Sequence, residues 1–208
     1  MAFNIDAFKS NGLILGGARS ALFSCSVTLP QTIQTTGGTG GVAQKFTYTC
    51  RAAELPAMTI GTVEVPYFGR RIKIAGDRTF ADWTATVMND EDWAVRSAFE
   101  AWQNGINEMI QNVRTFVNEQ PTSNNLASYK QTVTITQYAK TGAIIAQYNL
   151  IGAYPTDLGA IALDWDNQNQ IETFPVTFAY DYFVPIPVLT VNQTTGIGVP
   201  ATDYSGAV

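Results

Sequence analysis

The chain has 208 residues, of which 46% are hydrophobic and only 14% are charged, and its net charge is −5. Because the charged fraction is well below the usual quarter, the composition favours burial of part of the surface in an assembly, with a surface rich in Thr, Asn and Gln as the alternative. An acidic chain lacks the basic footprint that is typical of nucleic-acid-binding proteins, and the lack of histidine excludes His-based catalytic triads and His metal sites.

Both ends of the chain are predicted to be accessory segments of a single domain that covers residues 1–208. Residues 1–20 form a mixed N-terminal arm, in which the apolar run at 13–15 is far too short for a signal peptide. Residues 188–208 are a Gly- and Thr-rich C-terminal tail. Because no stretch approaches the roughly 18 apolar residues of a membrane span, we expect a protein made in the cytosol with no membrane partner.

Two stretches with period-two alternation predict the first two strands. Residues 21–30 and 46–55 each alternate between apolar and polar side chains, and residues 31–45 between them are a Gly/Thr-rich loop. We expect these strands to pair as a hairpin, with Cys25 and Cys50 facing the core. Buried free thiols are favoured over a disulfide because Cys behaves as a small apolar residue.

The segment 55–80 is predicted to be an extended hairpin that contacts another subunit. It follows a strand that Pro56 ends, is rich in β-formers, and turns at Gly69. A loop longer than a connection needs is usually functional. Nucleic-acid binding is an alternative, but the basic cluster is small, and acidic residues of a neighbouring copy explain it at least as well. The candidate contact residues are Tyr67, Phe68, Arg70, Arg71, Lys73 and Arg78.

The sequence after this segment predicts a strand followed by the main helix. Residues 80–88 alternate as a strand. Asn89 is a good N-cap with Asp92 at the third helical position, and apolar residues follow at helical spacing to about Asn104. Four aromatic residues are predicted to pack between the helix and the sheet: Trp83, Trp93, Phe99 and Trp102.

The second half of the chain predicts four more strands. These are residues 129–139, 143–151, 160–163 and 171–183, with a turn at Tyr154 and Pro155 and a stop at Pro185 and Pro187. Together, the predicted elements indicate a mainly β protein with one main α-helix, arranged as an antiparallel barrel or sandwich.

No motif in the chain predicts catalysis, a cofactor or a metal. The GGTGG run at 37–41 lacks the GK[ST] ending of a phosphate loop. Residues 164–175 start like a calcium loop but lack its glycine and its closing Glu. The sequence has four candidate catalytic carboxylates, but they have no recognised catalytic spacing. An enzymatic function is therefore much less favoured than a structural role in an assembly. The four are Glu54, Glu64, Asp164 and Asp166.

Four further stretches are informative together. They are GGAR at 16–19 leading into Leu22 and Phe23; LP at 55–56 leading through GR at 69–70 to Phe80; Trp83 with SAFEAW at 97–102; and IETF at 171–174 leading to FAYDY at 178–182. In their order and spacing, these stretches resemble the tail tube proteins of contractile-tailed, T4-like bacteriophages. The loops at 31–45 and 112–125 and the tail are longer than a minimal family member needs.

The resemblance implies six-membered rings that stack into a hollow tube with a β-barrel inner wall and the helix outside. It also implies a sheath around the tube, tape-measure protein and DNA in the lumen without specific binding, a baseplate and a tail terminator at the ends, and location in the virion after assembly in the host cytoplasm. Similar type VI secretion tubes suggest the alternative, a tube or tube-cap protein of a secretion or injection device. A strand face rich in Thr and Ser suits a wet inner wall. The candidate lumen residues are Ser24, Ser26, Thr28, Thr47, Thr49, Thr173, Thr177 and Asp181.

Overall fold

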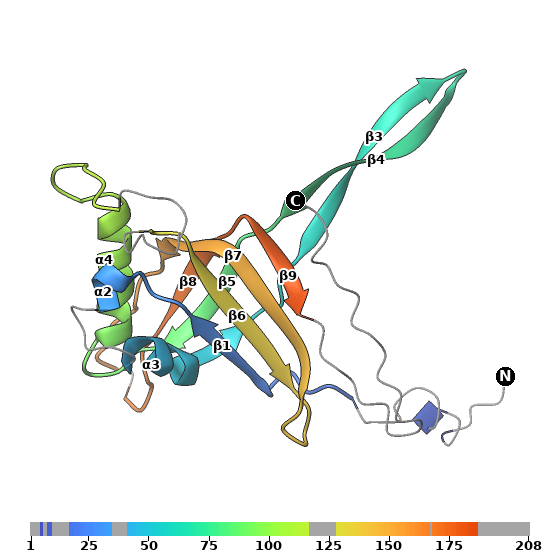
Figure 1. The fold of residues 1–208 in the computed structure, drawn as a ribbon. Coiled ribbons are helices and arrows are strands. Elements are labelled where there is room, and N and C mark those ends of the chain that lie inside the picture. Colours follow the sequence, from blue (N-terminus) through green and yellow to red (C-terminus); the bar gives the residue numbers. More distant parts are fainter. Residues whose placement is uncertain are drawn as a thin grey trace.

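A curled β-sheet, with helices against one side and a long hairpin projecting from the other end, makes up the fold (Figure 1). The computed structural model describes residues 17–34, 41–116, 128–166 and 168–186, together with Ile5, Phe8 and Lys9. The predicted tail at 188–208 and most of the predicted arm at 1–20 lie outside the described residues, so both stay predictions.

Within the described residues, seven strands form the main antiparallel sheet. Their order is β1-β6-β7-β8-β5-β2, and β9 pairs with β7 beside this path. The strands are β1 (Phe23–Val27), β2 (Cys50–Ala53), β5 (Trp83–Met88), β6 (Gln131–Tyr138), β7 (Ile144–Leu158), β8 (Thr173–Ala179) and β9 (Tyr182–Ile186). Long β7 pairs with β6 and β9 along its first part and with β8 along its last part, so it joins two layers of a sandwich-like sheet. The predicted antiparallel, mainly β fold class is confirmed in its sandwich form.

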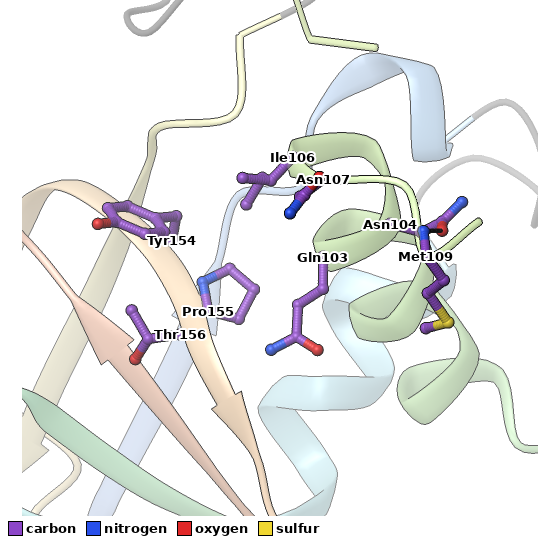
Figure 2. A pocket seen from close by; sticks show the side chains of 8 residues that line it. All are labelled: Gln103, Asn104, Ile106, Asn107, Met109, Tyr154, Pro155 and Thr156. Carbon is purple, nitrogen blue, oxygen red and sulfur yellow. Dashed lines mark hydrogen bonds between the residues drawn. The ribbon is translucent and has the colours of Figure 1, made fainter. Parts of the chain in front are cut away.

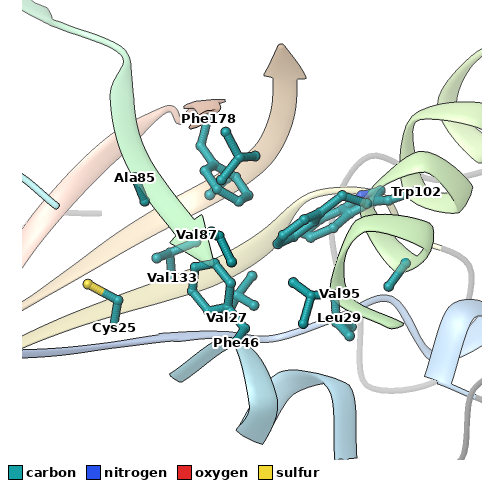
Figure 3. Packing of buried hydrophobic residues seen from close by; sticks show 14 of the residues in the cluster. Cys25, Val27, Leu29, Phe46, Ala85, Val87, Val95, Trp102, Val133 and Phe178 are labelled. Carbon is teal, nitrogen blue, oxygen red and sulfur yellow. The ribbon is translucent and has the colours of Figure 1, made fainter. Parts of the chain in front are cut away.

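The core lies between the helices and one face of this sheet (Figure 3). Phe178 on β8 is fully buried, and its ring lies 5.6 Å from that of Trp83, 5.7 Å from that of Phe99 and 6.3 Å from that of Trp102. The Trp102 indole N–H donates to the carbonyl of Tyr129 at 2.9 Å, so its polar atom is satisfied inside the core. The structure therefore brings three of the four predicted aromatic residues together.

The predicted second strand is mostly a helix. Residues Gly41–Thr49 form α3, and β2 begins only at Cys50 and pairs with β5 instead of β1. The segment also fits helical spacing, because Val42, Ala43 and Phe46 share one helix face and the Phe46 ring packs edge-on against Phe99 at 5.6 Å. The predicted loop before it contains the short helix α2 (Gln31–Gln34).

The two cysteines lie beside each other without a disulfide. Cys25 is buried and Cys50 is half-buried, and both are free thiols. A hydrogen bond with Cys50, together with burial, raises the pKa of the Cys25 thiol well above its ordinary value, whereas the same hydrogen bond lowers the pKa of Cys50. The pair comes together although β1 and β2 do not form the predicted hairpin.

The main helix, α4, spans Ala94–Ile106 and starts later than predicted. Trp93 is its N-cap, with φ 54° in the left-handed region, and its side chain is 43% exposed, so the prediction that Trp93 packs in the core is wrong. Asn89 does not cap the helix, because its side-chain amide donates to Glu172 Oε2 at 3.1 Å. The Asp92 carboxylate accepts from the backbone N–H of Ala94 at 3.0 Å instead.

The predicted strands after residue 143 also differ from the structure. Tyr154 and Pro155, predicted as a turn, lie inside β7, and residues 160–163 are not a strand. The predicted strand 171–183 is two strands, because the chain bends at Asp181 and β9 folds back onto β7. Pro185 lies within β9, where the edge of the sheet tolerates the missing N–H.

Gly152 allows β7 to pass from one layer to the other. Its φ of +72° favours glycine, and a Cβ there would lie 2.3 Å from Asp181 Oδ2. We expect Gly152→Ala to lower the free energy of unfolding by more than the roughly 1–2 kcal/mol cost of a left-handed Ala, measured as a drop in Tm. Gly142→Ala is the control, since Gly142 has φ +85° but open space around its Cβ position. Equal losses in the two variants would contradict a contribution from the Asp181 contact.

Candidate assembly surfaces: the projecting hairpin and the polar sheet face

Strands β3 (Met58–Tyr67) and β4 (Arg70–Phe80) form a hairpin that extends away from the body of the protein (Figure 1). The strands pair in antiparallel register from Met58 opposite Phe80 to Tyr67 opposite Arg70. Phe68 and Gly69 form the tip, with φ 40° and 79°, as expected for a two-residue hairpin turn in which both central residues have positive φ. At the base, the ring of Phe80 lies 5.6 Å from that of Phe183, which ties the hairpin to the main sheet.

One face of the hairpin is apolar although it is exposed. In register, Val63 lies opposite Ile74 and Val65 lies opposite Ile72, and all four side chains are exposed. We call these four residues the apolar hairpin face. Soluble monomers rarely expose contiguous apolar surface of this kind, and a two-stranded hairpin without a covered face is at best marginally stable in water. The hairpin therefore has the properties of a segment that is buried in an assembly.

The predicted contact residues are concentrated at the outer part of the hairpin. Phe68 is 90% exposed at the tip, next to Tyr67, whose ring lies 4.7 Å away. Arg71 donates to Glu64 Oε2 at 2.9 Å, but both side chains are exposed, so this ion pair contributes little to stability. Within the described part of the chain, three cationic side chains of the hairpin have no carboxylate within 4 Å: Arg70, Lys73 and Arg78.

Polar, uncharged side chains cover the face of the main sheet that points away from the core. We call this the polar sheet face. Its members alternate along their strands with apolar residues of the core, and the register places them side by side on neighbouring strands. They are Ser24, Ser26, Thr84, Thr86, Thr134, Gln147, Asn149, Thr173 and Thr177, whereas Thr136 on the same side of β6 is buried.

Hydrogen bonds between strands organise this face. The hydroxyl of Thr134 donates to Asn149 Oδ1 at 2.9 Å, and the hydroxyls of Thr84 and Thr177 lie 3.1 Å apart. The residues named as the polar sheet face are neutral, and the exposed carboxylate of Asp157 lies opposite Thr177 in register, so the face can hold water but offers no cationic side chain among these residues.

The predicted lumen residues separate into two groups in the structure. Ser24, Ser26, Thr173 and Thr177 belong to the polar sheet face, and exposed Thr28 follows directly after β1. Asp181 lies instead in the bend before β9, paired with Lys130 at 2.9 Å.

The lumen prediction is wrong for Thr47 and Thr49. Both lie on α3, where their hydroxyls donate to the carbonyls of Ala43 and Lys45 in the preceding turn. The members of the polar sheet face on β5, β6 and β7 were not among the predicted lumen residues, because choosing them requires the strand register. The alternation of Thr with Val and Ile in residues 131–138 was the signal for one of these strands.

One hollow of the surface is lined by neutral side chains. This hollow, of about 430 Å³, lies between the end of α4 and β7, and Figure 2 shows that the amide side chains of Gln103, Asn104 and Asn107 share it with Tyr154 and Met109. The residues that line it include no Asp, Glu, Lys, Arg or Cys. Among the described residues, no group of three or more Cys, Asp and Glu side chains is arranged to hold a metal ion, and no helix has the length and apolarity needed to cross a membrane.

The fold is similar to that of tube components from two contractile injection systems. The sheath-tube complex of the extracellular contractile injection system PVC, in its extended state, contains a chain that matches with a TM-score of 0.51 and 15% identity, over 90% of this chain and 100% of that one. The tube-terminating cap of the anti-feeding prophage matches with a TM-score of 0.53 and 17% identity, over 82% of this chain and 91% of that one. At these identities the similarity concerns the fold.

Sequence comparison places the chain in a family. Residues 18–185 match the family described as phage tail tube protein. The tail tube protein gp19 of Enterobacteria phage T4 is 38% identical over 143 residues, which cover 68% of this chain and 83% of the relative, and the counterpart from Enterobacteria phage T6 matches to the same extent. The matched region includes both the projecting hairpin and the polar sheet face, and the chain therefore belongs to the phage tail tube protein family.

Proposed function

We propose that this chain is the structural subunit of a contractile tail tube. Copies form hexameric rings, and the rings stack into a hollow conduit for the ejection of DNA into the host. The observation that carries the proposal is the projecting hairpin, whose exposed apolar face and basic outer part have no covering partner in the described part of the chain. Among the described strands, β1 and β2 each pair with a single other strand, which adds support, because pairing between subunits would remove edges that otherwise promote aggregation.

In this proposal the polar sheet face lines the lumen. A wall of neutral Ser, Thr, Asn and Gln side chains in an acidic protein gains nothing from counterion release, which is the main source of non-specific affinity for DNA. DNA and a tape-measure protein would therefore pass along the wall without being held. Helix α4 lies on the opposite side of the sheet, so in this proposal it lies on the outside of the tube (Figure 1).

The further partners in this proposal are a sheath around the tube, with a baseplate and a tail terminator at its ends. Similar folds occur in a solved sheath-tube complex and in a baseplate of contractile injection systems, which supports these partner classes. The protein acts as a single domain in the virion, after assembly in the host cytoplasm.

A second candidate is a tube or tube-cap protein of a phage-like injection device. The similarity to the tube-terminating cap of the anti-feeding prophage favours it. A cap ends a tube and does not extend it, so polymerisation of the purified protein into long tubes separates the two roles.

The test of the hairpin is a charge reversal, Arg70→Glu with Arg71→Glu. We expect this variant to remain a folded monomer by circular dichroism but to form few tubes at high concentration, measured by sedimentation and electron microscopy. Both side chains are exposed, so reversal costs little in the monomer but juxtaposes like charges wherever the hairpin meets acidic groups. Arg70→Lys with Arg71→Lys keeps the charge and should assemble. Normal tubes from the Glu variant would rule out the role of the hairpin charges.

A further inference from the structure

A second exposed apolar surface lies where α4 begins, on the loop that joins β7 to β8. Trp165 is 98% exposed, and Leu163 and Ile171 beside it are also exposed. The loop borders a hollow of about 470 Å³, which is within the size range of ligand pockets. We call Leu163, Asp164, Trp165, Asp166 and Ile171 the acceptor surface. Such a concentration of exposed large apolar side chains indicates a contact with another molecule.

The acceptor surface is strongly acidic. Asp164 and Asp166 flank Trp165, and Glu172 lines the same hollow. Within the described residues, no Lys or Arg lies within 4 Å of the carboxylates of Asp164 and Asp166. After Lys140 the whole chain has no further Lys or Arg. A partner for this surface must therefore supply cationic as well as apolar side chains.

The turn before α4 extends this negative field. The backbone N–H of Asn89 donates to the carbonyl of Glu172 at 2.8 Å, which holds the turn against the end of the β7–β8 loop. The turn carries Asp90, Glu91 and Asp92, and the Lys45 ammonium contacts Asp90 and Asp92 and keeps the pKa of both carboxyls below the ordinary value. One cation faces three carboxylates there, so the surroundings of the acceptor surface remain negative.

The projecting hairpin of a second copy has the complementary chemistry. Residues 58–80 hold four of the chain's 12 basic residues and only two of its 17 acidic ones. The tip carries the exposed aromatic side chains of Tyr67 and Phe68 directly beside Arg70. In Figure 1 the hairpin and the β7–β8 loop lie at opposite ends of the molecule. A contact between opposite ends of identical chains is head to tail, and this type of contact propagates.

We propose that the acceptor surface receives the hairpin tip of a copy in the adjacent ring. The aromatic tip packs against Trp165, and Arg70 and Arg71 face Asp164 and Asp166. This inference rests on the proposed tube function and assigns the partner of its hairpin. The amide-lined hollow of Figure 2 is a poorer match, because it contains no carboxylate to complement the arginines.

Charge exchange between the two surfaces tests the pairing. Asp164→Arg with Asp166→Arg should raise the critical concentration for tube formation at least about tenfold, as Arg70→Glu with Arg71→Glu does, because each variant juxtaposes like charges. Combining all four substitutions should restore assembly to within about threefold of the unmodified chain, since the pairs are then re-formed with opposite polarity. Glu108→Arg, which reverses a partly exposed carboxylate just after α4, at the other end of that helix from the acceptor surface, is the control and should not rescue the hairpin variant.

The outcomes separate this inference from the proposed function. If the hairpin variant fails to assemble but the acceptor variant forms normal tubes, or if the combination is not restored, the hairpin contacts another surface and the inference is wrong while the tube function stands. If the hairpin variant itself assembles normally, the role of the hairpin charges in the tube is wrong. An acceptor variant that forms tubes but no longer binds a separate basic protein would assign the surface to that protein and would also overturn the inference.

Discussion

Val65→Asp combined with Ile72→Asp is expected to abolish tube assembly and to leave the isolated subunit folded. These residues lie opposite each other on the apolar hairpin face and are exposed in the subunit, so Asp loses little packing there. In an assembly the same positions would be buried, and each unpaired carboxylate would then have to be desolvated, which costs several kcal/mol. Sedimentation velocity and electron microscopy measure assembly, and thermal unfolding measures the subunit.

The opposite face of the same hairpin provides the matched control. Thr62 and Ala75 are also paired in register, so Thr62→Asp with Ala75→Asp places the same charges on the other face of the hairpin. We expect this control to assemble at concentrations much closer to those of the unmodified chain. Equal loss of assembly in both variants would mean that the hairpin strands, and not the apolar hairpin face, are what the assembly requires.

Phe178→Ala is expected to be the most destabilising change within the subunit. The ring is fully buried and contacts Trp83, Phe99 and Trp102, so its removal leaves a cavity between the sheet and α4. Substitutions of this kind lower the free energy of unfolding by about 3–5 kcal/mol. Urea unfolding should be measured in the Arg70→Glu, Arg71→Glu background, because assembly would otherwise add to the apparent stability.

Thr177→Ala, at the preceding position on the polar sheet face, is the comparison. It removes one hydroxyl contact with Thr84 at 3.1 Å, and we expect a loss of about 1 kcal/mol. If Phe178→Ala lowers the free energy of unfolding by no more than Thr177→Ala does, then the side of β8 that carries Phe178 is not more buried than the side that carries Thr177. The proposal that the polar sheet face is the lumen wall would then lose its support.

Several elements could be predicted because their signals are local. Residues 23–29 and 132–136 alternate between apolar and polar side chains, as is typical of an antiparallel strand with one buried face. The hairpin at 55–80 is recognisable from Pro56 before it, Gly69 at its turn and the β-formers between them. The register of β3 and β4 then follows from the turn as far as Thr62 opposite Ala75, beyond which it shifts between Thr62 and Ile60.

The wrong secondary-structure predictions arise where the two-residue period of a strand and the 3.6-residue period of a helix both fit the same residues. Phe46, Tyr48 and Cys50 alternate as in a strand, but Phe46 also follows Val42 and Ala43 at helical spacing. The helical conformation allows Phe46 to pack against Phe99 in the core. In the same helix the side chain of Tyr48 is exposed to solvent. Trp93 was misplaced for a similar reason, since its helical spacing to later apolar residues does not show that the helix begins one residue after it.

By itself, the sequence determined the antiparallel β class, the main helix, the long hairpin with its basic tip, and the alternation of Thr and Ser with apolar residues along single strands. These depend on interactions between residues that are close in the chain. Only the tertiary structure decided the strand order, the helical state of residues 41–49, the members of the polar sheet face on β5, β6 and β7, and the position of the acceptor surface opposite the hairpin. These features depend on contacts between segments that are distant in the sequence. Local periodicity does not show which of these segments pack together.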